Sequence, residues 1–277
     1  MNDIRKQAAV LGSPIAHSKS PALHRAAYNQ LGLDWTYGLF DVNEAQLPDF
    51  IAGLDSSWAG LSLTMPLKEV VIDLLDDVTD FARTLRSVNT VLPGSEPDTW
   101  RGTNTDVQGI VASIREAAGT HAIDGQAVVL GSGATARSAI AALPELGVKS
   151  AVVCARRHEA AEEVQALARH FGVDVTIRDL SPDADLMGAD LLVSTLPGDA
   201  AAPWAAVAPR ASGVLLDASY HPWPTPLASA WSGRAIASGR DMLLWQAVEQ
   251  VRLMTGCDPD PQVMRAAMEA SDAQSSG

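Results

Sequence analysis

The residue whose charge is most unusual for its position is Lys68. Pro66 predicts the start of a helix, which leaves the Lys68 ammonium in the first turn, against the positive end of the helix dipole. A cation there costs a few tenths of a kcal/mol to about 1 kcal/mol. Two explanations are open: a proton-transferring amine with a lowered pKa, or a surface lysine whose aliphatic stem packs on apolar neighbours.

Asp106 is the carboxylate that best suits such an amine. It is expected in the first turn of a helix that Asn104 or Thr105 caps, a position that an acid favours for structural reasons alone. Beside a lysine that needs a counter-charge, however, it is also a candidate partner in acid–base catalysis.

Hydroxyl and amide side chains gather in two further runs. Ser18 and Ser20 lie in a loop before a helix that Ser20 is expected to open as N-cap, followed by Pro21. Two hydroxyl donors near a helix N-terminus suit a carboxylate, although for Ser20 alone plain capping is the simpler explanation. Asn89, in the run Ser-Val-Asn-Thr, could bond a polyol hydroxyl.

A glycine-rich turn, Gly131 to Ala136, follows the apolar strand Ala127–Leu130 directly and opens a helix. Glycines in this context let the backbone turn tightly and approach a pyrophosphate, which then lies on the positive helix N-terminus. The competing explanation is an ordinary tight turn between strand and helix.

Two arginines follow the next strand, at Arg156 and Arg157, and no acidic residue precedes Glu159. An NAD site normally places an acid here to accept a hydrogen bond from the ribose 2′-hydroxyl. Guanidinium groups would instead bind a 2′-phosphate, so the pattern favours NADP over NAD. A solvated basic loop is the alternative.

Composition limits the remaining possibilities. The 277 residues are 47% hydrophobic, enough for two domains with their own cores, and the net charge of −13 argues against binding to duplex nucleic acid. Two cysteines, no signal-peptide pattern and no apolar stretch of membrane-spanning length indicate a cytoplasmic protein without a membrane segment. The histidines and cysteines lack metal-ligand spacing, so no metal is expected.

The elements that must position these residues follow two patterns. Residues 1–105 alternate short strands and helices, ending in an antiparallel hairpin, and we expect a substrate-binding α/β domain. Residues 106–239 alternate regularly, with continuous apolar strands typical of a parallel sheet covered on both faces, and we expect a Rossmann-like NADP domain. Residues 240–277 predict helices, with a loose tail from Ser271 to Gly277.

These runs together resemble the NADP-dependent shikimate dehydrogenase family over nearly the whole chain. The resemblance includes the SPIxHSxSP run, TxPxK from Thr64 to Lys68, Asn89-Thr90, and Asn104 to Asp106. It continues through the glycine-rich turn, Asp217 to Tyr220, and Gly239 with Gln246. The family fold implies an N-terminal substrate domain, a Rossmann-like parallel-sheet NADP domain, and C-terminal helices that return to the first domain.

The resemblance also implies roles for individual residues. Lys68 and Asp106 would form the catalytic pair that reduces 3-dehydroshikimate, in the pathway to chorismate and the aromatic amino acids. The implied substrate-binding residues are Ser18, Ser20, Thr64, Asn89, Tyr220 and Gln246. The implied cofactor-binding residues are Gly131, Ser132, Gly133, Ala134, Thr135, Arg156, Arg157, Thr195 and Gly239.

The sequence departs from the family pattern in places. Ser62 stands where many members have Asn, and Ala155 and Ala160 replace an Asn and a basic residue near the phosphate-binding arginine, for which Arg157 would compensate. Alternatives are a quinate/shikimate or aminoshikimate dehydrogenase, a folate-type dehydrogenase/cyclohydrolase, and a non-catalytic NADP-binding regulator. A monomer or homodimer acting on a small molecule is expected.

Overall fold

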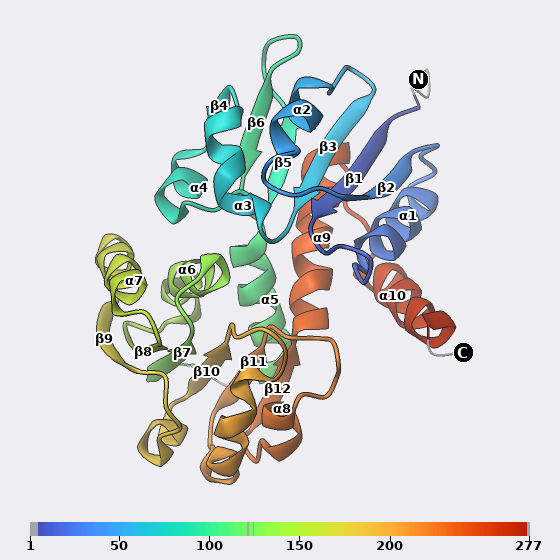
Figure 1. The fold of residues 1–277 in the computed structure, drawn as a ribbon. Coiled ribbons are helices and arrows are strands. Elements are labelled where there is room, and N and C mark those ends of the chain that lie inside the picture. The colour runs from blue at the N-terminus through green and yellow to red at the C-terminus, as the bar shows by residue number, and fades with distance from the viewer. Residues whose placement is uncertain (1–4, 121, 124, 276–277) are drawn as a thin grey trace. The chain divides into compact units, whose positions relative to one another are not determined.

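The computed structural model describes residues 5–120, 122–123 and 125–275, which form two compact units (Figure 1). The first unit combines residues 1–105 with residues 246–277, and the second comprises residues 106–245. The C-terminal helices therefore return to the first unit. Residues 240–245, which the sequence analysis grouped with those helices, belong to the second unit, because one continuous helix, α9 (Gly239–Thr255), extends across the boundary.

The first unit is built on a six-stranded sheet in the order β2-β1-β3-β5-β6-β4. Strands β1, β2 and β3 are parallel, whereas β5 is antiparallel to both β3 and β6, which confirms the predicted hairpin. The strands are β1 (Gln7–Gly12), β2 (Thr36–Asp41), β3 (Trp58–Leu63), β4 (Asp77–Val78), β5 (Thr90–Pro93) and β6 (Trp100–Thr103).

Alternation along β3 divides the two faces of this sheet. Leu61 and Leu63 belong to the apolar core shared with the helices that follow β2 and β3, whereas Ser62, between them, bonds Gln250 of α9 on the opposite face. The other helices of the unit are α1 (Ser20–Gln30), α2 (Leu47–Ala52), α3 (Leu67–Val70), α4 (Asp80–Leu85) and α10 (Pro261–Ser275).

Two local predictions in this unit are wrong. Lys19 is the N-cap of α1 and Ser20 is its first helical residue, with no side-chain capping bond, so the Ser20 hydroxyl does not cap the helix. The expected loose tail is helical as far as Ser275, because Met264 and Met268 are buried and α10 packs against α1; residues 276–277 lie outside the described part of the chain.

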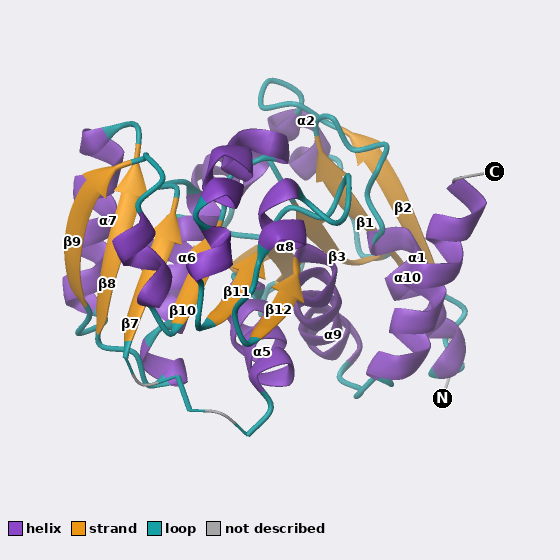
Figure 2. Cartoon of the chain, turned by 90° about the horizontal axis from the view of Figure 1, so that it is seen from below, coloured by secondary structure: helices purple, strands orange, loops and turns teal. Residues whose placement is uncertain are grey.

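The second unit is built on a fully parallel six-stranded sheet in the order β9-β8-β7-β10-β11-β12, which Figure 2 shows in sequence across the unit. This is the strand order of dinucleotide-binding Rossmann folds, with its reversal point between β7 and β10. The strands are β7 (Gln126–Leu130), β8 (Ser150–Ala155), β9 (Asp174–Asp179), β10 (Leu191–Ser194), β11 (Val214–Asp217) and β12 (Ala235–Ser238).

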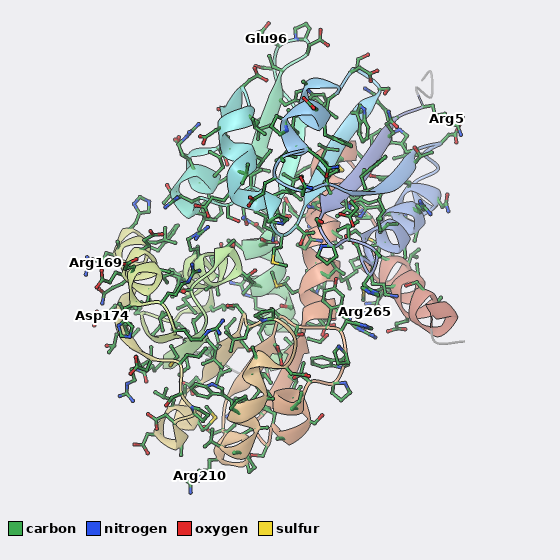
Figure 3. The ribbon with its side chains drawn as sticks, viewed as in Figure 1. Arg5, Glu96, Arg169, Asp174, Arg210 and Arg265 are labelled. Atoms are coloured by element: carbon green, nitrogen blue, oxygen red, sulfur yellow. The ribbon has the colours of Figure 1, made fainter. Side chains whose placement is uncertain are left out.

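Both faces of this sheet are covered, which explains the uninterrupted apolar strands. Helices α5 (Asp106–Ala118), α6 (Ala134–Ala142) and α7 (His158–His170) pack on one face. On the other face, Trp204 and Leu227 of the 3-10 segment Gly198–Ala206 and of α8 (Pro226–Ala230) share a core with Val128 and Leu215. Charged side chains such as Arg169, Asp174 and Arg210 point outwards from the unit (Figure 3).

Candidate active site

The loop that carries Ser18 and Ser20 lies beside the loop that carries Thr64. The backbone amide of Ser13 donates to the carbonyl of Met65 at 3.0 Å, and that of Thr64 donates to Leu11 at 3.0 Å. Gly12 permits this approach, since a Cβ at that position would meet the Thr64 side chain and the Met65 carbonyl. The two predicted substrate-binding loops therefore meet at the carboxyl ends of the parallel strands β1 and β3.

Within the first loop, the two serines are linked. The Ser20 amide donates to the Ser18 hydroxyl at 3.4 Å, and the Ser20 side chain is buried whereas that of Ser18 is half-buried. A carboxylate at this loop would meet hydroxyl groups and the beginning of α1 together, which suits an anion.

Helix α3 begins directly after Pro66, and Lys68 is its second residue, in the first turn as the sequence predicts. The helix is only four residues long, and the Lys68 side chain is half-buried. Its backbone carbonyl accepts from the amide of Val88 at 2.8 Å. This bond ties the lysine to the segment that leads into Asn89.

Asn89 is the best-connected of the predicted substrate-binding residues in the first unit. Its side chain is 1% exposed, and its Oδ1 accepts from the Thr105 amide at 2.8 Å and from the Thr90 hydroxyl at 2.9 Å. Its Nδ2 lies 3.0 Å from Thr105 Oγ1 and 3.4 Å from Gln246 Oε1. Gln246, on α9, is thereby placed beside Asn89 although the two residues are far apart in sequence.

Asp106 follows this cluster immediately in the chain. It is the first residue of α5 and is 3% exposed. Of its two predicted caps, Thr105 bonds Asn89, and the Asn104 amide donates to the Ser87 carbonyl at 2.9 Å. The unit boundary falls between Thr105 and Asp106, and the pairing of Asp106 with Lys68 stays a prediction.

The glycine-rich turn of the second unit has the backbone geometry of a phosphate cradle. Gly131 has φ +112°, which favours glycine, and a Cβ there would meet the Thr195 hydroxyl. That hydroxyl and the Thr195 amide both donate to the Leu130 carbonyl, at 2.8 and 2.9 Å. Gly133 caps α6 and has no atom within 4 Å of where its Cβ would be.

These features fit a pyrophosphate at the point where the strand order of the sheet reverses. The helix N-terminus points its amides and the positive end of its dipole to that place. The predicted cradle residues lie together there: Gly131, Ser132, Gly133, Ala134 and Thr135 follow β7, and Thr195 follows β10.

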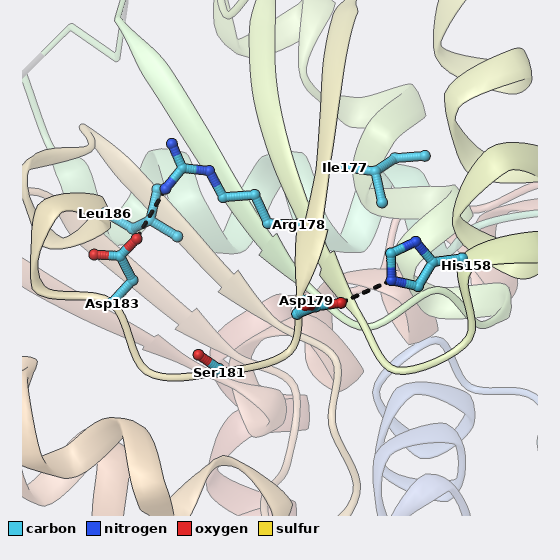
Figure 4. A pocket seen from close by; sticks show the side chains of 7 residues that line it. All are labelled: His158, Ile177, Arg178, Asp179, Ser181, Asp183 and Leu186. Atoms are coloured by element: carbon cyan, nitrogen blue, oxygen red, sulfur yellow. Dashed lines mark hydrogen bonds and ion pairs between the residues drawn. The ribbon is translucent and has the colours of Figure 1, made fainter.

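Arg156 and Arg157 follow β8 and are exposed, with Arg157 at the N-cap of α7. Within the described residues, neither guanidinium has a hydrogen bond or an ion pair. A hollow of about 410 Å³ lies at β9 and is lined by residues of that strand, by His158 and by residues that follow the strand (Figure 4). Its charges are paired, His158 with Asp179 at 2.7 Å and Arg178 with Asp183 at 2.8 Å, so the unengaged arginines are the better anion ligands.

The loop that carries Tyr220 is held at both ends by Asp217. The Asp217 carboxylate accepts from the Ser219 amide at 3.2 Å and from the Thr225 hydroxyl at 2.6 Å. Burial raises the pKa of Asp217, and these hydrogen bonds oppose the shift. Tyr220 itself is half-buried, and burial raises its pKa. Gly239 lies against the Ala218 carbonyl, where a Cβ would clash.

Sequence reasoning missed several side chains that support these residues. They are Tyr37, Thr90 and Gln250 in the first unit, and Asp217 and Thr225 in the second, whose hydrogen bond holds the Tyr220 loop. A signal for Gln250 was present, because it follows Gln246 by four residues and so lies on the same helix face. In the described part of the chain, no group of three or more His, Cys, Asp or Glu side chains could hold a metal ion.

The fold and the glycine-rich cradle together define a class: α/β oxidoreductases with a substrate-binding unit and a Rossmann-type unit for a nicotinamide dinucleotide. Among the helices of the described residues, none has the length and apolar character needed to cross a membrane.

Comparison with known proteins specifies the family. Residues 10–91 match the shikimate dehydrogenase substrate binding domain, and residues 239–269 match the shikimate 5′-dehydrogenase C-terminal domain. Shikimate dehydrogenase (NADP(+)) of Geobacter metallireducens is 35% identical over 92% of this chain and 93% of its own length. The chain belongs to the shikimate dehydrogenase family.

Solved structures agree with this assignment. Shikimate dehydrogenase of Mycobacterium tuberculosis is 42% identical, with a TM-score of 0.88 over 96% of this chain and 100% of that one. The Thermus thermophilus enzyme, solved with NADP(H) and shikimate, is 32% identical, with a TM-score of 0.81 over 96% and 99%. Quinate dehydrogenase of Corynebacterium glutamicum, solved with NAD, is 27% identical, with a TM-score of 0.85 over 96% and 99%.

Proposed function

We propose that this protein is an enzyme that interconverts shikimate and 3-dehydroshikimate with NADP, in the pathway to the aromatic amino acids. The observation that carries the proposal is the arrangement in the first unit, where the Ser18–Ser20 loop, Thr64, Asn89 and Gln246 are positioned by the sheet and by α9. Together with family membership, this favours a small substrate that bears a carboxylate and several hydroxyls.

Each of these residues has a role that its chemistry supports. Ser18 and Ser20 donate to the substrate carboxylate, with Tyr220 completing its binding. Thr64, Asn89 and Gln246 bond the ring hydroxyls, since their hydroxyl and amide groups can both donate and accept.

Lys68 and Asp106 are proposed as the catalytic pair. In the oxidation, the Lys68 amine takes the proton of the hydroxyl that becomes the ketone, and in the reduction the ammonium returns a proton to that oxygen. Asp106 orients the lysine and accepts from the substrate hydroxyl. NADP, when bound, supplies the hydride acceptor at its nicotinamide ring.

For the cofactor, Gly131 to Thr135 and Thr195 would hold the pyrophosphate, and Gly239 lets the backbone approach closely at the end of β12. Arg156 and Arg157 would bind the 2′-phosphate, and this pair favours NADP over NAD.

The second candidate is oxidation of quinate, which the similarity to quinate dehydrogenase supports. The arginine pair argues against NAD as the cofactor, but it does not discriminate between quinate and shikimate as the substrate. On composition we place the enzyme in the cytoplasm, as a monomer or homodimer without nucleic-acid or membrane partners.

The test is a steady-state assay of purified protein with shikimate and NADP⁺, followed by the absorbance of reduced nicotinamide, for the wild type and Asp106→Asn. Turnover by the wild type and a severe loss in the variant are expected. Absence of turnover would leave an NADP-binding regulator as the better explanation, and an active Asp106→Asn would remove the acid–base role.

A further inference from the structure

We propose that Gln250, acting through Thr90, is a positioning residue that, together with the Thr105 backbone amide, holds the Asn89 amide in one orientation and so sets the hydrogen-bond polarity of the substrate site. Neither Gln250 nor Thr90 belongs to the predicted site. The inference rests on the proposed function, because it concerns the same substrate.

A one-way chain of hydrogen bonds carries the argument. The Tyr37 hydroxyl donates to Ser62 Oγ at 2.6 Å, and Ser62 Oγ donates to Gln250 Oε1 at 2.8 Å. Gln250 Nε2 then donates both of its hydrogens, one to the backbone carbonyl oxygen of Asn89 at 3.1 Å and one to Thr90 Oγ1 at 3.0 Å. Each donor hydrogen in this chain therefore has one acceptor.

The chain ends on the side chain of Asn89. Having accepted from Gln250, the Thr90 hydroxyl uses its only hydrogen to donate to Asn89 Oδ1 at 2.9 Å. The Thr105 hydroxyl lies within bonding distance of both amide atoms of Asn89 and does not fix the orientation. The Thr105 backbone N–H can only donate and meets Oδ1 at 2.8 Å, so it favours the same orientation as the Thr90 hydroxyl, and the two donors hold Oδ1 together.

With Oδ1 engaged on that side, Nδ2 is directed towards Gln246, whose Oε1 lies 3.4 Å away. This distance is long for a hydrogen bond, so a substrate hydroxyl that accepts from Nδ2 can replace the contact at little cost. The geometry thus presents Asn89 to the substrate as a donor.

Burial makes the chain stiff. The side chains of Tyr37, Asn89, Thr90 and Gln250 are each no more than 1% exposed, and that of Ser62 is 4% exposed. Removal of one member leaves buried partners unsatisfied, without water to replace it. Gln250 also joins three elements, since it bonds β3 and β5 from α9 and lies one turn after Gln246 on the same helix.

The network also explains Ser62, the residue that departs from the family pattern. Its hydrogen is donated to Gln250 and it accepts from Tyr37, so its hydroxyl belongs to the support of Asn89. The hydrogen of the Ser62 hydroxyl is thus used inside the network, and Ser62 supports Asn89 through Gln250.

The test compares Thr90→Val, which removes the hydroxyl at nearly constant shape, with Thr90→Ser, which keeps it. Thr90→Val should raise KM for shikimate about 3- to 10-fold, the effect of one hydrogen bond, with the dissociation constant of NADPH unchanged. Thr90→Ser should restore KM to the wild-type value. Gln250→Met, which removes both donors, is the second variant and should raise KM at least as much.

Equal KM values for the wild type, Thr90→Val and Gln250→Met, with only the melting temperature lowered, would overturn the inference and leave a purely structural network. Equal defects in Thr90→Ser and Thr90→Val would also overturn it, since the hydroxyl would not be responsible. A wild type that fails to oxidise shikimate overturns the proposed function and this inference with it, whereas an active wild type with unaltered variants overturns the inference alone.

Discussion

The polar residues of the first unit and the arginines of the second differ in how far the protein has already fixed them. Asn89 and Gln246 are 1% and 7% exposed and are bonded to their neighbours, whereas Arg156 and Arg157 are exposed and have no side-chain partner in the described residues. The proposed substrate residues are thus held in place without substrate, whereas we expect the arginines to become ordered only when the cofactor binds. Preorganised groups lose little conformational entropy on binding, whereas each exposed side chain that a ligand orders costs about 0.5–1.5 kcal/mol.

The largest expected effect is that of Lys68→Ala. Loss of a general acid–base group typically costs about 10²- to 10⁴-fold in rate, so kcat should fall by about that factor with a modest change in KM. Steady-state kinetics with shikimate and NADP⁺ measure it, and Lys149→Ala, at an exposed lysine of the second unit, is the matched control. Wild-type turnover in Lys68→Ala would reject the catalytic assignment.

A second prediction concerns the rigid side of the comparison. His24 is fully buried, stacks on Tyr37 with ring centroids 4.0 Å apart, and donates from Nδ1 to the Ser20 carbonyl at 3.0 Å. Burial lowers its pKa from 6.5 to about 4, against the opposing effects of Ser20 and Gln250. The folded protein therefore holds this histidine neutral.

Because the unfolded chain binds the proton more readily, this contribution to stability is complete above pH 6.5 and is lost as the pH falls to about 4. The difference between the two pKa values corresponds to about 3 kcal/mol. Urea unfolding of the wild type and of His24→Gln, which cannot titrate, should show their difference in unfolding free energy shrinking by about that amount between pH 7 and pH 4. A pH-independent difference would contradict a neutral buried His24.

The role of the exposed arginines of the second unit is tested by Arg156→Ala. Charge-assisted hydrogen bonds of about 1.5–3 kcal/mol predict NADPH binding weakened by roughly 10- to 150-fold, with NADH binding unchanged. Isothermal titration measures both, and Arg169→Ala, at the far end of α7, is the control. Equal losses for NADPH and NADH would point to a disturbed fold, and no loss would remove the argument for the 2′-phosphate.

The smallest effect is expected for Asp179→Asn. Its hydrogen bond with His158 Nε2 is short at 2.7 Å, but the two side chains, of Asp179 and His158, are 85% and 61% exposed. Exposed pairs contribute about 0–1 kcal/mol, so the melting temperature should change by no more than about 2 °C. A larger drop would show that this exposed pair stabilises the edge of the parallel sheet more than exposed pairs usually do.

The sequence predicted the fold of the second unit well. It did not predict the hydrogen-bond network that supports Asn89 in the first unit. Continuous apolar strands and the Gly131 turn are local patterns, and the parallel sheet with its cradle follows from them. The Tyr37–Ser62–Gln250–Thr90 chain joins residues from four separate elements, β2, β3, α9 and β5, which no local pattern connects. Ser20 was misplaced as a cap because Lys19 adopts a helical conformation before it, and Ser271 was misplaced because tertiary packing extends α10.

The most direct test of the whole account is the ratio of kcat/KM for shikimate with NADP⁺ to that for quinate with NAD⁺. Family membership, for the substrate, and the arginine pair of the second unit, for the cofactor, both predict a ratio far above unity. A ratio near or below unity would contradict both the substrate and the cofactor assignment.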